Sequence, residues 1–218
     1  KITATADSIH FSEYMISDFQ GEIITAPMEV RLNRTQFDLI GSDVEMSGTY
    51  RASSPFSANF DYQISAKEFD IQRAYQEIPI FKEMVSFAEF AEGKAALEYK
   101  LSGRLDANMY PVLPSIKGEG SLGLKSVKLK GFKLMNSVAE QTDNKELTDP
   151  ELNDIEIKTS IENNLMTIPR TRMRIAGFRP RMEGQVSLDG DLNLGIRLGL
   201  PPLGIFGVPI KITGNAAD

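Results

Sequence analysis

The sequence predicts a mainly β protein, built as an elongated antiparallel sheet with one or two short packing helices. Apolar and polar residues alternate over long stretches, and a period of two places one set of side chains on one face of a sheet. Turn residues such as Ser53-Ser54-Pro55 and Asp189-Gly190 separate these stretches. The regular alternation of strands and helices that is typical of a parallel sheet does not occur along the chain.

Composition excludes several classes of protein. The chain has 218 residues, of which 41% are hydrophobic and 25% charged, as expected of a folded domain. It contains no cysteine, which excludes disulfides and thiolate metal sites, and its one histidine, His10, lies in a strand-like run. Residues 1–110 carry 10 Lys/Arg against 17 Asp/Glu, and residues 111–218 carry 14 against 13. This balance does not favour nucleic-acid binding, and we expect no cofactor and no metal.

The chain opens at Lys1 directly in strand-like sequence. It shows neither a signal peptide nor an apolar run near the roughly 20 residues of a membrane span. We therefore expect residues 1–218 to form a single β-rich fragment of a longer protein.

Residues 1–66 are predicted to form the leading strands. The run FSANFDYQIS shows the pattern most clearly, because its polar residues all fall on one face. The other face is predicted to consist of Phe56, Ala58, Phe60, Tyr62 and Ile64.

Residues 67–93 are predicted to be a helical segment. From Asp70 to Glu92 the apolar residues recur at helical spacing, with Pro79 suited to a first turn and Gly93 just past the end. The apolar face of this helix either packs on the sheet or forms a mobile lid over a groove.

Residues 94–218 return to strands. Leu122 and Leu124 share a face, whereas Val127 and Leu129 resume one residue out of step, which predicts a turn or bulge at Lys125-Ser126. A short helix is predicted near 132–140.

The run VSLDGDLNLGIRLGL, from Val186 to Leu200, predicts a hairpin with one apolar face. A three-residue loop, Asp189 to Asp191, pairs Leu188 with Leu192 and keeps that face intact, and a continuous strand is the alternative. The apolar floor of a groove is predicted to consist of Leu122, Leu124, Val186, Leu188, Leu192, Leu194, Ile196 and Leu198.

No enzyme signature is found. Asp189 and Asp191 lie in a turn and do not converge from two sides of a cleft, and the GEGSLG run lacks the Lys-Ser/Thr of a phosphate-binding loop. Two basic runs form either a solvated outer face or a contact with lipid headgroups or a partner. Their members are Lys125, Lys128, Lys130, Arg170, Arg172 and Arg174.

Three segments together resemble the C-terminal region of the AsmA family: KGEGSLGLKSVKLKGFKLMNSVAE, LNDIEIKTSIENNLMTIP and FRPRMEGQVSLDGDLNLGIRLGLPPLGIFGVPIKITGN. The likeness extends upstream to about residue 56. The residues that fit the family's pattern are Gly118, Gly120, Gly131, Phe132, Leu134, Gly184, Leu188, Asp189, Gly190, Pro201, Pro209 and Gly214.

The resemblance implies a periplasmic protein of the Gram-negative envelope, anchored to the inner membrane by an N-terminal helix that lies outside this chain. AsmA-like proteins are similar to bridge-like lipid-transfer proteins, in which a curved, repeated β-sheet forms a trough with an apolar floor for phospholipid. The resemblance therefore implies that the elongated antiparallel sheet of this chain is curved and trough-like. The implied function is non-catalytic phospholipid transport between inner and outer membrane and outer-membrane biogenesis. The implied partners are phospholipid acyl chains and envelope membranes or proteins. Two alternatives stay open: a scaffolding domain that binds no lipid, and a sheet closed on itself as a sandwich.

Overall fold

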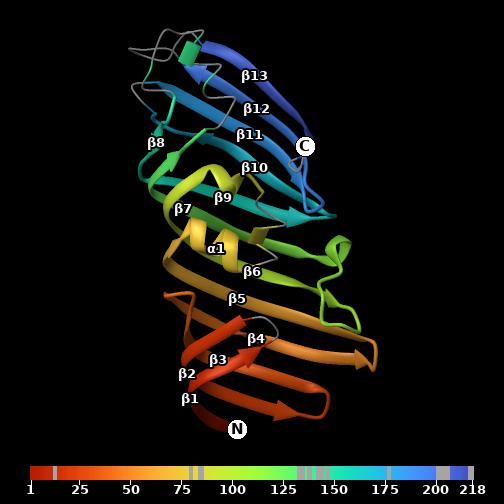
Figure 1. Cartoon of the computed structure of the whole chain (residues 1–218). Helices are drawn as coiled ribbons and strands as arrows, with labels where there is room; N and C mark the ends of the chain where they lie inside the picture. Colours follow the sequence, from red (N-terminus) through yellow and green to blue (C-terminus); the bar gives the residue numbers. More distant parts are fainter. Residues whose placement is uncertain are drawn as a thin grey trace. The chain divides into compact units, whose positions relative to one another are not determined.

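The computed structural model describes residues 1–11, 14–78, 81–82, 86–131, 136, 139–140, 145, 148–175, 178–199 and 207–215. Most of these residues lie in thirteen antiparallel strands of one open sheet, so the predicted mainly β class is confirmed and the closed sandwich is not formed (Figure 1). The strands follow one another in sequence order, except that the short β8 pairs only with β7. Within the described residues, β1 and β13 are the two edges.

The strand bounds are as follows: β1 (Ile2–Phe11), β2 (Tyr14–Ala26), β3 (Glu29–Leu39), β4 (Ser42–Ser54), β5 (Ser57–Asp70), β6 (Ala91–Leu105), β7 (Lys117–Leu129), β8 (Glu151–Leu152), β9 (Ile155–Glu162), β10 (Leu165–Arg172), β11 (Arg179–Ser187), β12 (Asp191–Gly199) and β13 (Gly207–Asn215). The described helical elements are α1 (Ile71–Glu77) and the 3₁₀ helices Ser86–Phe90 and Leu113–Ser115. No helix among the described residues is long and apolar enough to span a bilayer.

The chain divides into two compact units. The first comprises Lys1–Phe69, Ala96–Ser121 and Ser160–Leu165, and the second comprises Asp70–Ala95, Leu122–Thr159 and Met166–Asp218. The sequence predicted a single β-rich fragment, with divisions after residues 66 and 93. Those divisions fall inside β5 and β6, because both strands extend into the segment that was predicted to be helical.

The core of the first unit follows the predicted alternation of β5. Ala58 and Phe60 are buried with Leu105, and Tyr50, Tyr62 and Leu101 pack against them. Asn59 and Asp61, on the other face, are exposed. The prediction was wrong for Phe56, which lies in the β4–β5 turn and is exposed.

The helical segment is shorter than predicted. Helix α1 begins after Asp70, whose carboxylate accepts a hydrogen bond from the Arg73 backbone N–H at 2.8 Å. Its Ile71 and Ala74 are buried, as expected of a packing element. The Gln72 side chain donates to the Ala88 and Ala91 carbonyl oxygens, at 3.0 and 2.8 Å, and so ties the helix to the start of β6.

The predicted C-terminal end of this helix was wrong. Ala91 and Glu92 already belong to β6, and Gly93 is a strand residue against Ser126 rather than a helix terminator. Residues 79–80 and 83–85 lie outside the described residues. So does most of the predicted helix at 132–140, of which Asn136, Ala139 and Glu140 are helical.

The irregularity predicted at Lys125-Ser126 is confirmed. Ser126 has a φ of 52° inside the continuous strand β7, while Val127 just after it is buried. A residue inserted in the left-handed region shifts the alternation by one position, as in a bulge. Arg34 has the same backbone conformation, with a φ of 52°, where the β3–β4 register shifts between Leu32 and Thr35.

Thr35 lies at that register shift and provides a first prediction. Its side chain is 1% exposed, and its Oγ1 has no hydrogen-bond partner among the described residues. Because an unsatisfied buried hydroxyl is costly, Thr35→Val is expected to leave the free energy of unfolding unchanged or to raise it by about 1 kcal/mol. Urea denaturation measures this. A loss above about 1 kcal/mol would show that the hydroxyl has a partner.

Candidate functional site

The predicted apolar hairpin is formed by β11 and β12, with a three-residue loop as expected. The loop consists of residues 188–190, not 189–191, so Val186 pairs with Leu192 and Leu188 lies in the turn. The turn closes by a 3.0 Å hydrogen bond from Gly190 N–H to the Ser187 carbonyl, with Gly190 at a φ of 96°. The register differs from the prediction by two residues, which leaves the same side chains on the same face.

Strand β13 extends the apolar face. The register places Leu194 opposite Ile212, Ile196 opposite Ile210 and Leu198 opposite Val208. The sequence predicted a strand here but did not assign its side chains to the face. The signal was the alternation in VPIKIT. We call this set of side chains the aliphatic face; its members are Val186, Leu192, Leu194, Ile196, Leu198, Val208, Ile210 and Ile212.

Most side chains of the aliphatic face are partly buried. Leu192, Leu194 and Ile196 are half-buried, and Val208 is 44% exposed. Leu198, at one end of β12, is buried, and so is Leu188 in the turn. These two predicted floor residues therefore belong to the packed interior, whereas the middle of the face remains accessible.

Leu122 and Leu124 do not join this face directly. Both are half-buried in β7, and the strand order places β9 and β10 between β7 and β11. At a spacing of about 4.8 Å per strand, three steps separate them from β11 by about 14 Å. The structure thus brings the hairpin residues together but leaves the two leucines of β7 apart from them.

Two of the predicted basic residues are engaged by carboxylates. Arg170 binds Glu183 through two hydrogen bonds of 2.9 Å, and Lys130 forms an ion pair with Glu92. These contacts lower the pKa of Glu183 and raise the pKa values of Arg170 and Lys130. All six predicted basic residues are exposed: Lys125, Lys128, Lys130, Arg170, Arg172 and Arg174.

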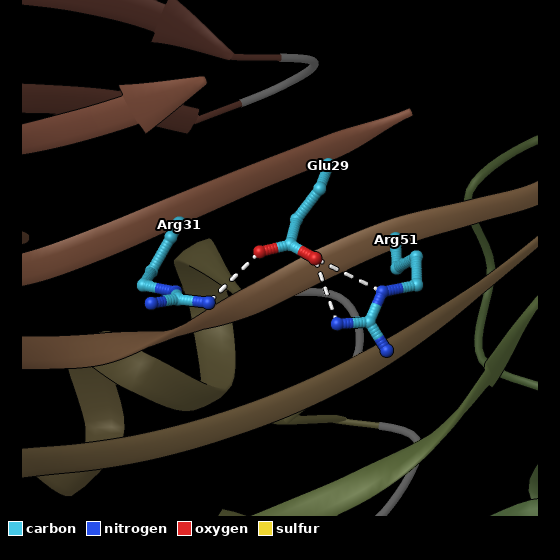
Figure 2. Close-up of polar contacts among 3 residues, drawn as sticks. All are labelled: Glu29, Arg31 and Arg51. Carbon is cyan, nitrogen blue, oxygen red and sulfur yellow. Dashed lines mark hydrogen bonds and ion pairs between the residues drawn. The ribbon is translucent and has the colours of Figure 1, made fainter. Parts of the chain in front are cut away.

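A second charged cluster, which the sequence analysis missed, lies on β3 and β4 (Figure 2). The Glu29 carboxylate accepts hydrogen bonds from Arg51 at 2.7 and 3.0 Å and from Arg31 at 2.9 Å. Glu29 and Arg51 are cross-strand partners 22 residues apart, so the chain's linear pattern gave no signal for them. The contact with Arg51, assisted by Arg31, lowers the pKa of Glu29.

The cluster gives a pH prediction. Because its pKa is lowered on folding, Glu29 contributes stability above the ordinary carboxyl pKa of about 4.3, and loses it as pH falls through the folded-state value. Arg51→Gln is expected to raise the pKa of Glu29 more than Arg31→Gln, because Arg51 makes the dominant contact. A carbon-detected NMR titration of the two variants measures the difference. Equal shifts would contradict this ranking.

In the part of the chain that the structure describes, no group of three or more His, Cys, Asp or Glu residues could hold a metal ion. His10 is a strand residue, paired with Met15. The Asp191 carboxylate accepts a 2.9 Å hydrogen bond from Asn215 Nδ2, which links the hairpin turn to the end of β13. Comparison with protein-family models, with characterised proteins and with solved structures gave no match for this chain.

Proposed function

We propose that this chain is a non-catalytic segment that handles phospholipid, with acyl chains lying against the aliphatic face of β11–β13. The observation that carries the proposal is the row of half-buried aliphatic side chains that continues across β12 and β13. The resemblance to the C-terminal region of the AsmA family supports a place in the periplasm. There, the segment would serve transport between inner and outer membrane and outer-membrane biogenesis.

The chemistry of the aliphatic face suits a hydrocarbon chain. An acyl chain has no hydrogen-bonding groups, and covering exposed apolar area contributes roughly 25 cal/mol per Å², or about 0.8 kcal/mol per CH₂ group. The cross-strand pairs Leu194–Ile212 and Ile196–Ile210 present only methyl and methylene groups to such a ligand. The face needs no directional contacts and would accept several lipids.

The opposite face of the same strands carries polar groups. Asn193, Arg197 and Lys211 alternate with the aliphatic residues and are exposed, as are Arg170 and Glu183 on the neighbouring strands. A sheet with one wet face and one partly covered apolar face is the arrangement expected of an open lipid-binding surface, because a solvated sheet otherwise buries its apolar face in a core.

A scaffolding domain is the second candidate function. It is favoured by the two edge strands that the described residues show, since an edge strand presents N–H and C=O groups with which a partner strand can pair. Pro209 and Lys211 in β13 interrupt one edge, whereas β1 contains neither proline nor lysine. A protein partner would therefore add a strand to β1.

Lipid content separates these two functions. The protein is purified without detergent, and an organic extract is analysed by mass spectrometry beside an extract of the same protein refolded from denaturant. Phospholipid at a fixed ratio to protein in the first sample, recovered by the refolded sample when it is mixed with phospholipid, is the expected result. If neither sample holds lipid, the scaffolding function is favoured.

A further inference from the structure

In the first compact unit, exposed apolar side chains lie in the turns at one end of the strands. In an antiparallel sheet whose strands follow one another in sequence order, every second connection lies at the same end of the strands. Here the connections β2–β3, β4–β5 and β6–β7 share one end (Figure 1). Each carries a large exposed apolar side chain: Met28 is 59% exposed, Phe56 73% and Tyr110 68%. We call these three connections the turn edge.

The three turns form a row. The Met28 carbonyl accepts a 2.8 Å hydrogen bond from the Ala52 N–H, so the β2–β3 turn lies against the end of β4. Phe56 follows in the next turn of the same edge. Because consecutive turns are two strands apart, the spacing along the row is about 10 Å.

Backbone N–H groups at two of these exposed side chains, Phe56 and Tyr110, have hydrogen-bond partners within their own turns. Proline precedes both Met28 and Phe56, and it restricts the turn conformation. The Phe56 N–H donates to Ser54 Oγ at 3.1 Å, and the Asp106 carboxylate accepts from the Tyr110 N–H at 2.9 Å. Because these backbone N–H groups are already hydrogen-bonded within the turn, moving them into a region of low polarity costs little free energy.

The positive charge that suits an anionic surface lies at the β2–β3 turn. The tips TAPM (25–28) and SSPF (53–56) carry no charge, and the third tip carries Asp106, whose carboxylate accepts hydrogen bonds from the Asn108 and Tyr110 backbone N–H groups. Directly behind Met28, the cluster of Figure 2 combines two guanidinium groups with one carboxylate, a surplus of one positive charge. The Arg51 side chain is more than half exposed, and a guanidinium there can bind a lipid phosphate.

We propose that the turn edge docks on a phospholipid bilayer, with Met28, Phe56 and Tyr110 entering the headgroup region. A protein interface needs a contiguous packed patch, whereas these side chains stand singly about 10 Å apart, which a fluid lipid surface accommodates. Tyrosine, with an apolar ring and a polar tip, is typical of that region. This docking is independent of the aliphatic face, which belongs to the other compact unit.

A single tryptophan tests the proposal directly, since the chain contains none. Phe56→Trp is mixed with vesicles of phosphatidylcholine and phosphatidylglycerol, and its fluorescence is expected to shift to the blue and to be quenched by brominated lipid. Gln63→Trp, at an exposed position within β5, is the matched control and is expected to show neither effect. If vesicles leave the Phe56→Trp spectrum unchanged, the proposal is wrong.

A second variant measures the contribution of the tips. Met28→Ser combined with Phe56→Ser is expected to reduce vesicle binding by about tenfold or more, because two exposed apolar side chains no longer enter the lipid. Both positions are exposed, so the melting temperature is expected to stay unchanged. Gln63→Ser, at an exposed position within β5 away from the tips, is expected to bind vesicles as the unaltered chain does. The double variant is expected to take up monomeric fluorescent phospholipid unchanged, which keeps this test separate from that of the aliphatic face. Self-association that the double variant abolishes, without vesicle binding, would instead assign the turn edge to a contact between copies.

Discussion

Gly48→Ala is expected to lower the free energy of unfolding by about 2–5 kcal/mol, from a strained backbone and a steric clash that each cost roughly 1–3 kcal/mol. Gly48 lies in β4 with a φ of 156°, directly opposite Tyr62 of β5. A Cβ atom at this position would come within 3.0 Å of the Asp61 carbonyl oxygen and of the Tyr62 backbone and ring. Because two of these contacts are with backbone atoms, the sheet itself would have to move.

Urea denaturation followed by circular dichroism measures the loss. Gly195→Ala is the matched control, because Gly195 is also a strand glycine but the nearest atom to its added Cβ is 3.7 Å away. The control is expected to change the free energy of unfolding by less than about 1 kcal/mol. Equal effects at the two positions would show that Tyr62 and its strand relax to accept the methyl group.

The expected loss at Gly48 reflects what the glycine makes room for. The Phe60 and Tyr62 rings stack with centroids 5.6 Å apart, and Tyr50 packs against the same cluster. Burial raises the pKa of the Tyr62 phenol, and the nearby Tyr50 adds to this shift. A glycine opposite an aromatic residue lets the ring lie over the neighbouring backbone. Gly48 thus supports the core of the first unit by having no side chain.

Alternation predicted which side chains share a face, because it is a local property of an extended chain. This is why the faces of β5 and β12 were predicted correctly over most of their length. The register of strand pairing was harder to predict from the sequence. The β11–β12 loop was placed one residue too late, since Asp189-Gly190 and Gly190-Asp191 are both acceptable in turns, and only the Ser187–Gly190 hydrogen bond distinguishes them.

The helical segment shows where local pattern fails. Residues 70–92 have helical spacing throughout, yet Ala91 and Glu92 lie in β6 because that strand pairs with β7, more than 25 residues further along the chain. Gly93 was assigned to a helix end, but it lies where the Ser126 backbone approaches too closely for a side chain. A long-range pairing partner outweighs local periodicity, and a single sequence does not reveal that partner.

Accessibility could not be predicted either. Leu188, Leu194 and Leu198 follow one alternating pattern, but the first and last are buried and the middle one is half-buried. Alternation encodes the face on which a side chain lies, but it does not encode how far other residues cover that side chain. The turn edge was missed for the same reason, since Phe56 fits the apolar face of β5 by spacing and leaves it only because the turn begins there.

Leu194→Arg is expected to abolish phospholipid binding while the chain remains folded. Leu194 is half-buried in the middle of the aliphatic face, where it packs over Gly184 and lies opposite Ile212. The arginine stem can lie over Gly184 in the same way and direct its guanidinium to water, as long charged side chains do at apolar borders. The charge would then occupy the surface on which an acyl chain is proposed to lie, and desolvating it would be costly.

The measurements are the melting temperature and the saturable uptake of a fluorescent phospholipid, with Asn193→Arg as the matched control. Asn193 is the adjacent residue of β12 on the exposed polar face, so the same charge there is expected to change neither quantity. A Leu194→Arg chain that unfolds would place Leu194 in a sealed core, where an unpaired charge costs several kcal/mol. A chain that folds and takes up lipid as before would show that the aliphatic face is not where lipid binds. Only a folded variant without uptake, beside an unaffected control, assigns lipid binding to the open middle of β11–β13.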